Sequence, residues 1–192
     1  SQANRVKLAS NKEDLQAMLI PRLTAVSLAL LLIAGCAAKA PDAPATVAAA
    51  GPYVCKHEGS PPKLRSDLPA SSYTADHQIS WPKDNGFDPP KLKVTVQPGE
   101  LVDRFGDTCG TFLSPDGASY RGRALPYQCQ GYAYAVYRVL KPLPVTIGTA
   151  APAFGEPGGA VQLQTSEQVG QLLAEGVLEK VPDAPPLSCG AH

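Results

Sequence analysis

Two arginines, Arg104 and Arg123, are the side chains whose type and setting best suit the binding of an anionic ligand. Both lie in residues 101–126, LVDRFGDTCGTFLSPDGASYRGRALP, with glycine or proline close by. The apolar residues 111–113 and the Ser-Pro-Asp-Gly turn after them predict a strand, turn and strand with one arginine near each end. A guanidinium on a short loop is a planar fork of donors that matches phosphate or carboxylate. Taken alone, these residues favour a simpler alternative, a local Asp103–Arg104 ion pair and a solvated Arg123.

Short strands are the elements that would position these arginines. The chain has 20 prolines and 17 glycines, which favour short strands and loops over long helices. Residues 132–140, with small and large side chains alternating, have the clearest strand pattern. An Asn-Gly turn lies between Trp81 and Phe87, which we expect in the core. Further strands are expected at residues 91–96, 145–147, 161–164 and 177–181.

One helix is predicted near the C-terminal end of the domain. Thr165 and Gln168 resemble a capping box, and Val169 and Leu172 share one face. Gly176 is expected to end the helix in the left-handed conformation. The predicted fold class is therefore α+β: a small, mostly antiparallel, β-rich domain with one clear helix.

Length and charge limit the class of protein. A chain of 192 residues is long enough for one ordinary globular domain plus extensions. The 17 Lys and Arg residues balance the 17 Asp and Glu residues, so nothing in the composition indicates a nucleic-acid partner.

The first 52 residues predict an export signal and a tether. Met18, the only methionine, is followed by an arginine and by an apolar run at 23–33 that is too short to span a membrane comfortably. Residues 33–36, Ile-Ala-Gly-Cys, resemble the lipobox of a bacterial lipoprotein, which would lipidate Cys36. We therefore expect an upstream extension at 1–17, a signal peptide at 18–35, a disordered tether at 36–52, an irregular segment at 53–80 and the domain at 81–192. The expected location is the cell envelope, with a lipid anchor in a membrane; Ala37 favours the outer membrane, periplasmic or surface-facing.

The cysteines indicate disulfides. With Cys36 lipidated, four of the five cysteines remain, and four allow two disulfides in three connectivities. We expect Cys109–Cys129 to brace the central stretch and Cys55–Cys189 to tie the two ends. The sequence has no C-x-x-C pair and its three histidines are scattered, so no metal site is predicted.

Five segments, in order and at family-like spacings, resemble the TNT domain. This NAD-glycohydrolase domain is named for the mycobacterial necrotizing toxin and is also found in fungal surface NADases. The segments are W-P-x-x-x-G-F at 81–87, D-R-F-G at 103–106 with G-x-F-L at 110–113, R-A-L-P at 123–126, F-G-x-P-G-G-x-x-Q at 154–162 and G-V-L-E at 176–179. Each motif is weak alone, but five in sequence are specific.

The resemblance implies cleavage of the bond between nicotinamide and ribose in NAD⁺, and also NADP⁺, to give nicotinamide and ADP-ribose. The dinucleotide is the substrate, and no cofactor is implied. Gln162, Arg123 and Arg104 fall at catalytic positions of the family, and these three with Phe112 fall at its substrate-binding positions. The match at Phe112 is to the aromatic class. An enzyme of this kind also needs an inhibitor protein as partner, because cytosolic NAD must be guarded.

This chemistry does not need a pair of carboxylates. Ordinary glycosidases use one carboxylic acid to protonate the leaving oxygen and a second carboxylate opposite. Nicotinamide in NAD⁺ is already a cationic pyridinium and leaves as a neutral molecule. Glu156, Asp103 and Asp107 are the carboxylates that could act as acid or base, but each is in a predicted turn, where solvated carboxylates are common.

One departure from the family pattern leaves two functions open. Some members use a histidine between R-A-L-P and the long strand, whereas this chain has none between Arg123 and Val139, and Ala135 is nearest that place. The first hypothesis is an exported NAD(P)⁺ glycohydrolase, a toxin effector or a surface enzyme. The alternative is a catalytically weak or inactive TNT-fold lipoprotein that binds a ligand or has a structural role in the envelope.

Overall fold

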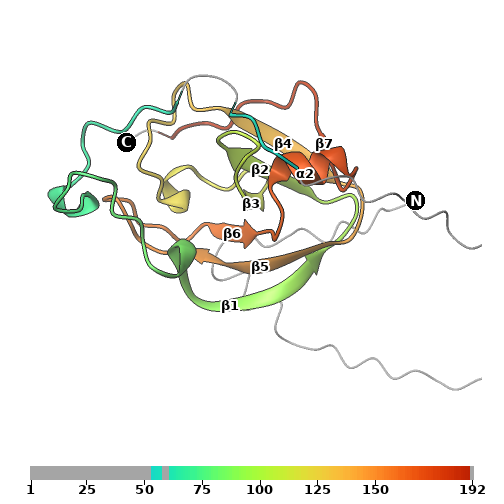
Figure 1. The fold of residues 1–192 in the computed structure, drawn as a ribbon, viewed down its shortest axis with the longest axis horizontal. Helices are drawn as coiled ribbons and strands as arrows, with labels where there is room; N and C mark the ends of the chain where they lie inside the picture. The colour runs from blue at the N-terminus through green and yellow to red at the C-terminus, as the bar shows by residue number, and fades with distance from the viewer. Residues whose placement is uncertain (1–52, 58–60, 191–192) are drawn as a thin grey trace, which may run out of the picture.

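The computed structural model describes residues 53–57 and 61–190 (Figure 1). The expected signal peptide, the lipidation site at Cys36 and the tether lie outside these residues. Within the described ranges, no helix is long and apolar enough to cross a membrane.

Seven strands form one sheet, and all hydrogen-bonded neighbours in it are antiparallel. The strand order is β1-β5-β6-β3-β2-β4-β7. The bounds are β1 Phe87–Val96, β2 Leu101–Phe105, β3 Phe112–Pro115, β4 Tyr134–Val139, β5 Leu143–Ala150, β6 Val161–Gln164 and β7 Leu178–Lys180. The other elements are helix α2 (Val169–Ala174) and three 3₁₀ turns, η1 Ala70–Ser72, η2 Asp84–Gly86 and η3 Arg121–Arg123. The predicted fold class is confirmed.

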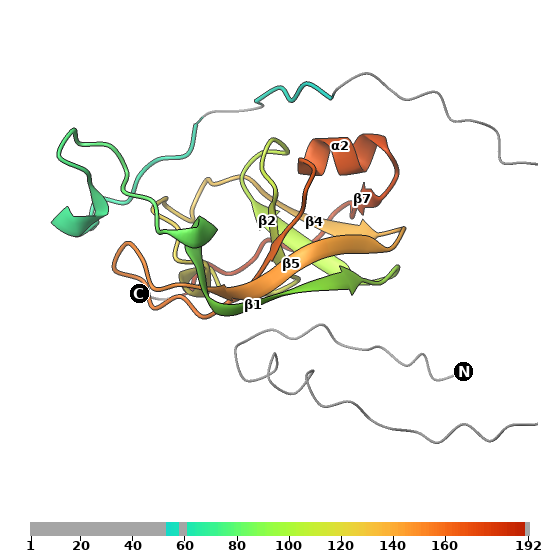
Figure 2. The ribbon, with the colours of Figure 1, turned by 60° about the horizontal axis from the view of Figure 1, so that its bottom comes forward.

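Strand β3 connects two halves of this sheet. Its first residues, Phe112 and Leu113, pair with β6, whereas Ser114 and Pro115 pair with β2. One half therefore contains β1, β5 and β6 and the other contains β2, β4 and β7, as the two views show (Figures 1 and 2). The main core joins apolar side chains of both halves and of α2, among them Val102, Val139, Ile147, Leu163, Leu172 and Leu178.

Helix α2 is capped differently from the prediction. It begins at Val169, and Gln168 is the N-cap without a side-chain hydrogen bond. The Thr165 hydroxyl lies within hydrogen-bond distance of two backbone carbonyls, so it does not take part in a capping box. The Val169 N–H donates instead to the Gly110 carbonyl at 3.0 Å, which satisfies one of the free donors of the first turn. Gly176 follows the helix with φ of 61°, as predicted.

The segment before β1 is attached to the domain by backbone hydrogen bonds. The Arg65 N–H donates to the Pro126 carbonyl at 3.0 Å, and the Gln128 N–H donates to the Lys63 carbonyl at 2.8 Å. These bonds lie on either side of an isolated bridge between Leu64 and Tyr127. Residues 63–65 thus extend along residues 126–128.

The disulfides join Cys55 to Cys109 and Cys129 to Cys189, so both expected pairs, Cys109–Cys129 and Cys55–Cys189, are wrong. The bonded Cα atoms are 5.4 and 5.7 Å apart, within the usual range. Cys109 belongs to the loop 108–110, whose carbonyls accept N–H groups from the start of α2. Cys129 belongs to a second, aromatic cluster that also contains Cys189. Nearness in the sequence was misleading because the chain between Cys109 and Cys129 passes through β3 and η3.

Candidate functional site

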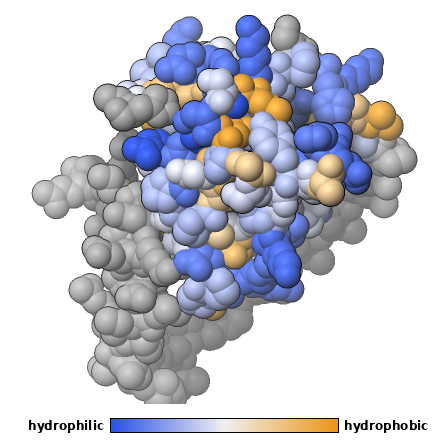
Figure 3. All heavy atoms as spheres, turned by 90° about the vertical axis from the view of Figure 1, so that its left-hand side faces the viewer, coloured by the Kyte–Doolittle hydropathy of each residue, from blue (hydrophilic) through white to orange (hydrophobic). Residues whose placement is uncertain are grey.

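A cavity of about 410 Å³ brings together the four site residues predicted from the sequence, Arg104, Phe112, Arg123 and Gln162. They come from β2, β3, η3 and β6, and the start of β1 and the end of β5 lie beside them. These strand ends are on the left of Figure 1. On the face seen from that side, apolar side chains are grouped in small patches among hydrophilic ones (Figure 3). The cavity is therefore built from segments far apart in the sequence, and the chemical roles of its residues stay predictions.

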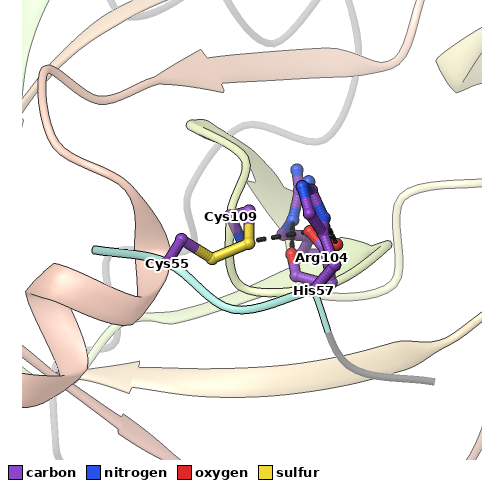
Figure 4. Close-up of a disulfide and its surroundings, with 5 residues drawn as sticks. Cys55, His57, Arg104 and Cys109 are labelled. Atoms are coloured by element: carbon purple, nitrogen blue, oxygen red, sulfur yellow. Dashed lines mark hydrogen bonds and ion pairs between the residues drawn. A yellow bond between two sulfur atoms is a disulfide. The ribbon is translucent and has the colours of Figure 1, made fainter. Parts of the chain in front are cut away.

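Arg104 is fixed by backbone carbonyls and not by Asp103. Its Nε donates to the Asp107 carbonyl at 2.6 Å, and its Nη1 donates to the Phe112 carbonyl at 2.8 Å. Burial lowers the pKa of Arg104, although a guanidinium with so high an ordinary pKa stays protonated at neutral pH. Nη2 makes no hydrogen bond to the described residues, so one donor group of a pocket-lining cation is available. Figure 4 shows Arg104 beside the Cys55–Cys109 disulfide.

Arg123 forms a buried ion pair, so the alternative of a solvated turn residue is wrong. Its Nη2 lies 2.5 Å from Oδ1 of Asp103, and the two side chains are 7% and 0% exposed. The other Asp103 oxygen accepts from the Tyr134 hydroxyl at 2.9 Å and from the Gly117 N–H at 3.1 Å. Burial raises the pKa of Asp103, while Arg123 and these two donors stabilise the carboxylate and oppose that rise. Asp103 is therefore the ion-pair partner of Arg123. Nη1 of Arg123 makes no hydrogen bond to the described residues.

Gln162 and Phe112 lie on one face of neighbouring strands. Val161 and Leu163 of β6 are buried in the core, so Gln162 between them projects to the opposite face. Phe112 pairs with Gln164, two residues further along β6, which places its ring on that same face.

The amide of Gln162 has a defined orientation. Its Nε2 donates to the carbonyl of Asn85 at 3.0 Å, and only the NH₂ side of an amide can make that bond. Asn85, whose φ is 56°, belongs to the η2 turn and also lines the cavity. Oε1 of Gln162 accepts no hydrogen bond from the described residues, so it is available to accept one from a ligand or water.

Aromatic rings form much of the remaining wall. Trp81 is 57% exposed and lines the cavity, so its expected place in the core is wrong, whereas Phe87 is buried at 4% as predicted. The Trp81 ring lies 5.6 Å from that of Phe154, edge to face, and 6.3 Å from that of Tyr127. Four further lining residues were not expected from the sequence: Tyr127, Tyr132, Phe154 and Asn85. Three of them are aromatic residues in loops, which carry no periodic signal.

None of the three candidate carboxylates lines the cavity, and each has a partner. Glu156 is bound by Arg65 at 2.6 Å and by Arg121 at 2.7 Å, and Asp107 contacts His57 at 2.6 Å. Among the described residues that line the cavity, none is acidic and none is a histidine. His57, Asp107 and Cys109 lie close together, but the Cys109 sulfur is in a disulfide and cannot also be a thiolate ligand.

Comparison with known proteins identifies the domain. The family model for the tuberculosis necrotizing toxin (TNT) matches residues 95–181. Residues 95–181 form a TNT domain. A conidial surface nicotinamide adenine dinucleotide glycohydrolase of Aspergillus fumigatus is 36% identical to this chain over 117 residues, which are 54% of this chain and 50% of that protein. The chain thus spans about half the length of this curated relative.

Two solved complexes also match part of this chain. One is the tuberculosis necrotizing toxin with its immunity factor, at 24% identity, 56% coverage of this chain, 65% coverage of the solved chain and a TM-score of 0.47. The other is Tse6 in complex with Tsi6, at 24% identity, coverages of 51% and 77% and a TM-score of 0.37.

The matched residues contain Arg104, Phe112, Arg123 and Gln162, whereas Trp81 and Asn85 precede them. Ala135, nearest the place of the family histidine, lies directly opposite Arg104 in the β2–β4 ladder.

Gly110 leaves the space that the guanidinium of Arg104 occupies. A Cβ atom at Gly110 would overlap the guanidinium of Arg104. Gly110→Ala should therefore displace the arginine, lower kcat/KM for the NAD⁺ hydrolysis proposed below by about 10²-fold and lower the free energy of unfolding by about 1–3 kcal/mol. Steady-state kinetics and urea denaturation measure the two effects. Unchanged kinetics in the folded variant would show that the position of Arg104 does not matter.

The Cys55–Cys109 disulfide should matter more for activity than Cys129–Cys189. It ties residues 53–57 to the loop whose Asp107 carbonyl binds Arg104. Loss of either native disulfide should cost about 2–5 kcal/mol of stability. We expect Cys55→Ser/Cys109→Ser also to lower kcat/KM for the NAD⁺ hydrolysis proposed below, and reduction with a thiol should have the same effect. The matched control Cys129→Ser/Cys189→Ser should keep the wild-type kcat/KM when both variants are measured at a temperature where they are folded. Equal kcat/KM for the two double variants and the wild type would contradict this expectation.

Proposed function

We propose that the protein is an NAD⁺ glycohydrolase that also accepts NADP⁺ and releases nicotinamide and ADP-ribose. The observation that carries this proposal is that Arg104, Phe112, Arg123 and Gln162 line one cavity, whose described lining residues include two cations and no acidic side chain. The relationship of the TNT domain to a fungal NAD glycohydrolase also supports it.

The absence of acidic groups from the lining suits a substrate with a cationic leaving group. The pyridinium of NAD⁺ takes the electrons of the glycosidic bond and leaves as neutral nicotinamide, so no proton donor is needed. The site has to hold the dinucleotide, exclude bulk water and admit one water to the oxocarbenium-like carbon. The proton that this water loses on forming the new C–O bond passes to solvent.

The cavity residues supply these functions. Arg104 and Arg123 both line the cavity, and each has one terminal nitrogen without a hydrogen bond to the described residues; these two cations would bind the pyrophosphate. The Phe112 ring forms an apolar wall for nicotinamide. Gln162, with Nε2 bound to Asn85, offers Oε1 to a ribose hydroxyl or to the attacking water.

Product analysis tests the reaction class. The oxidised protein should convert NAD⁺ to equal amounts of nicotinamide and ADP-ribose, and NADP⁺ to nicotinamide and the 2′-phosphorylated ADP-ribose. Consumption of NAD⁺ without free nicotinamide would indicate cleavage at another bond and overturn the proposal.

A second function is favoured by two observations. Ala135 lies opposite Arg104, near where other members use a histidine, and Arg123 already has a buried carboxylate partner. These features suit a TNT-fold lipoprotein that binds a dinucleotide without hydrolysing it. Saturable NAD⁺ binding without nicotinamide release would select this alternative.

We further propose that the protein is exported to the cell envelope, anchored through Cys36 and active as a toxin or surface enzyme. An enzyme that hydrolyses NAD⁺ endangers the cell that makes it, so an inhibitor protein is part of this proposal. The Cys36→Ser variant should remain unprocessed or mislocalised, as measured by membrane fractionation and mass spectrometry of the N-terminus. Full-length protein in the soluble fraction with Cys36 unmodified would exclude the anchor.

A further inference from the structure

Trp81 is a large aromatic side chain that the proposed reaction does not use. It is 57% exposed although it lines the cavity, so its indole ring is presented to solvent and to any ligand there. It precedes the residues matched by the family model. An exposed tryptophan at a cavity is a surface for planar rings, because stacking removes apolar area from water and every base has an aromatic face.

A row of aromatic contacts connects Trp81 to Arg123. The Arg123 guanidinium lies 5.2 Å from the Phe105 ring centroid, and the Phe105 ring lies 5.9 Å from that of Tyr132. The Tyr132 ring contacts Tyr127 at 5.2 Å, and Tyr127 contacts Trp81 at 6.3 Å. Trp81 is thus at the end of a row of rings that begins at a guanidinium.

Phe112 contacts Arg104 and Phe87, and Gln162 contacts the η2 turn. The Phe112 carbonyl accepts a hydrogen bond from Arg104, and the Phe112 ring lies 6.4 Å from the Phe87 ring. The cavity therefore offers the Phe112 ring beside Arg104 and an aromatic group around Trp81. These groups match the parts of a dinucleotide in kind: Phe112 suits the nicotinamide, the two guanidiniums suit the pyrophosphate and Trp81 suits the adenine.

The position of the rings around Trp81 is fixed by polar contacts behind them. Phe154 precedes the loop residue Glu156, which is bound by Arg65 and Arg121. Tyr127 is held by the bridge to Leu64. Both loops are attached to the segment that leads to Trp81, which brings the Tyr127 and Phe154 rings beside the indole.

We propose that Trp81, with Phe154 and Tyr127, forms a stacking site for the adenine ring of the dinucleotide. This proposal rests on the proposed function for its substrate, but the site can be measured without turnover. Trp81 is the only tryptophan of the chain, so its fluorescence reports ligand stacking directly.

The first experiment titrates the oxidised full chain with AMP, which carries the adenine and lacks nicotinamide. Saturable quenching of Trp81 fluorescence, and competitive inhibition by AMP at the same concentrations, are expected. If nicotinamide is never released but AMP quenches, the proposed function fails and the stacking site stands. If nicotinamide release is normal but AMP leaves the fluorescence unchanged, the stacking site fails alone.

The second experiment compares NAD⁺ with nicotinamide mononucleotide, which has the same scissile bond and no adenine. Trp81→Ala should raise KM for NAD⁺ by about 5- to 150-fold with kcat nearly unchanged, the range for one base stacked on an aromatic ring. It should leave kcat/KM for the mononucleotide unchanged, and Trp81→Phe should restore most of the affinity for NAD⁺. The control Leu140→Ala removes an exposed apolar side chain outside the cavity. Equal losses on both substrates in Trp81→Ala would overturn the proposal.

Discussion

Replacing Gln162 by alanine is expected to lower kcat/KM for NAD⁺ by about 30- to 1,000-fold, the effect of losing about 2–4 kcal/mol of transition-state stabilisation from one positioned polar group. The expectation follows from the orientation of the amide, whose Nε2 is bound to Asn85 and whose Oε1 is available in the cavity. Stability should change little, because Gln162 lies on the face of β6 opposite the core. Steady-state kinetics and the Tm measure the two quantities.

Gln164 provides the matched control. It lies on the same strand and face, and its side chain accepts from Asn85 at 3.4 Å, but it does not line the cavity. Gln164→Ala should therefore keep kcat/KM near the wild-type value. Normal activity in Gln162→Ala would remove Gln162 from the mechanism, and similar losses in both variants would assign the effect to the η2 turn.

The largest effect on stability is expected from Asp103. Its carboxylate is fully buried and pairs with Arg123, whose side chain is only 7% exposed. Asp103→Ala would leave the buried guanidinium without its counter-charge, which should lower the free energy of unfolding by about 3–5 kcal/mol. Chemical denaturation at pH 7 measures this loss.

Asp103→Asn separates charge from shape, because it keeps a side-chain oxygen for the Tyr134 and Gly117 donors while removing the charge. Its loss should be smaller than that of Asp103→Ala. If Asp103→Ala changed the free energy of unfolding by only about 0.5 kcal/mol, as surface substitutions typically do, the pair would not stabilise the fold. Because Arg123 pairs with Asp103, a loss of activity in Arg123→Ala has two causes: the lost ligand contact and the buried carboxylate that is left unpaired.

Sequence patterns predicted the parts of the fold that repeat along the chain. Alternation along 132–140 predicted β4, residues 161–164 were expected as the short strand that is β6, and Gly176 predicted the end of α2, because each depends on neighbouring residues. The motifs identified Arg104, Phe112, Arg123 and Gln162, which the structure brings together in one cavity.

Features that depend on contacts between distant segments were not predictable in this way. The disulfide pairing depends on the separation in space between the loop 108–110, which contains Cys109, and the aromatic cluster, which contains Cys129 and Cys189. The cap of α2 comes from the Gly110 carbonyl and not from Thr165. Trp81 was expected in the core on residue type alone, but the fold leaves it at the cavity with more than half of its surface exposed.

The most direct measurement of the central claim is the rate of nicotinamide release from saturating NAD⁺ by oxidised residues 53–192, with wild type and Gln162→Ala compared at matched folded concentration. We predict continuous release of nicotinamide with an equal amount of ADP-ribose by the wild type, and a rate lower by about 30- to 1,000-fold in the variant at an unchanged Tm. Folded, oxidised wild-type protein that releases nicotinamide no faster than NAD⁺ decays in buffer would contradict the account.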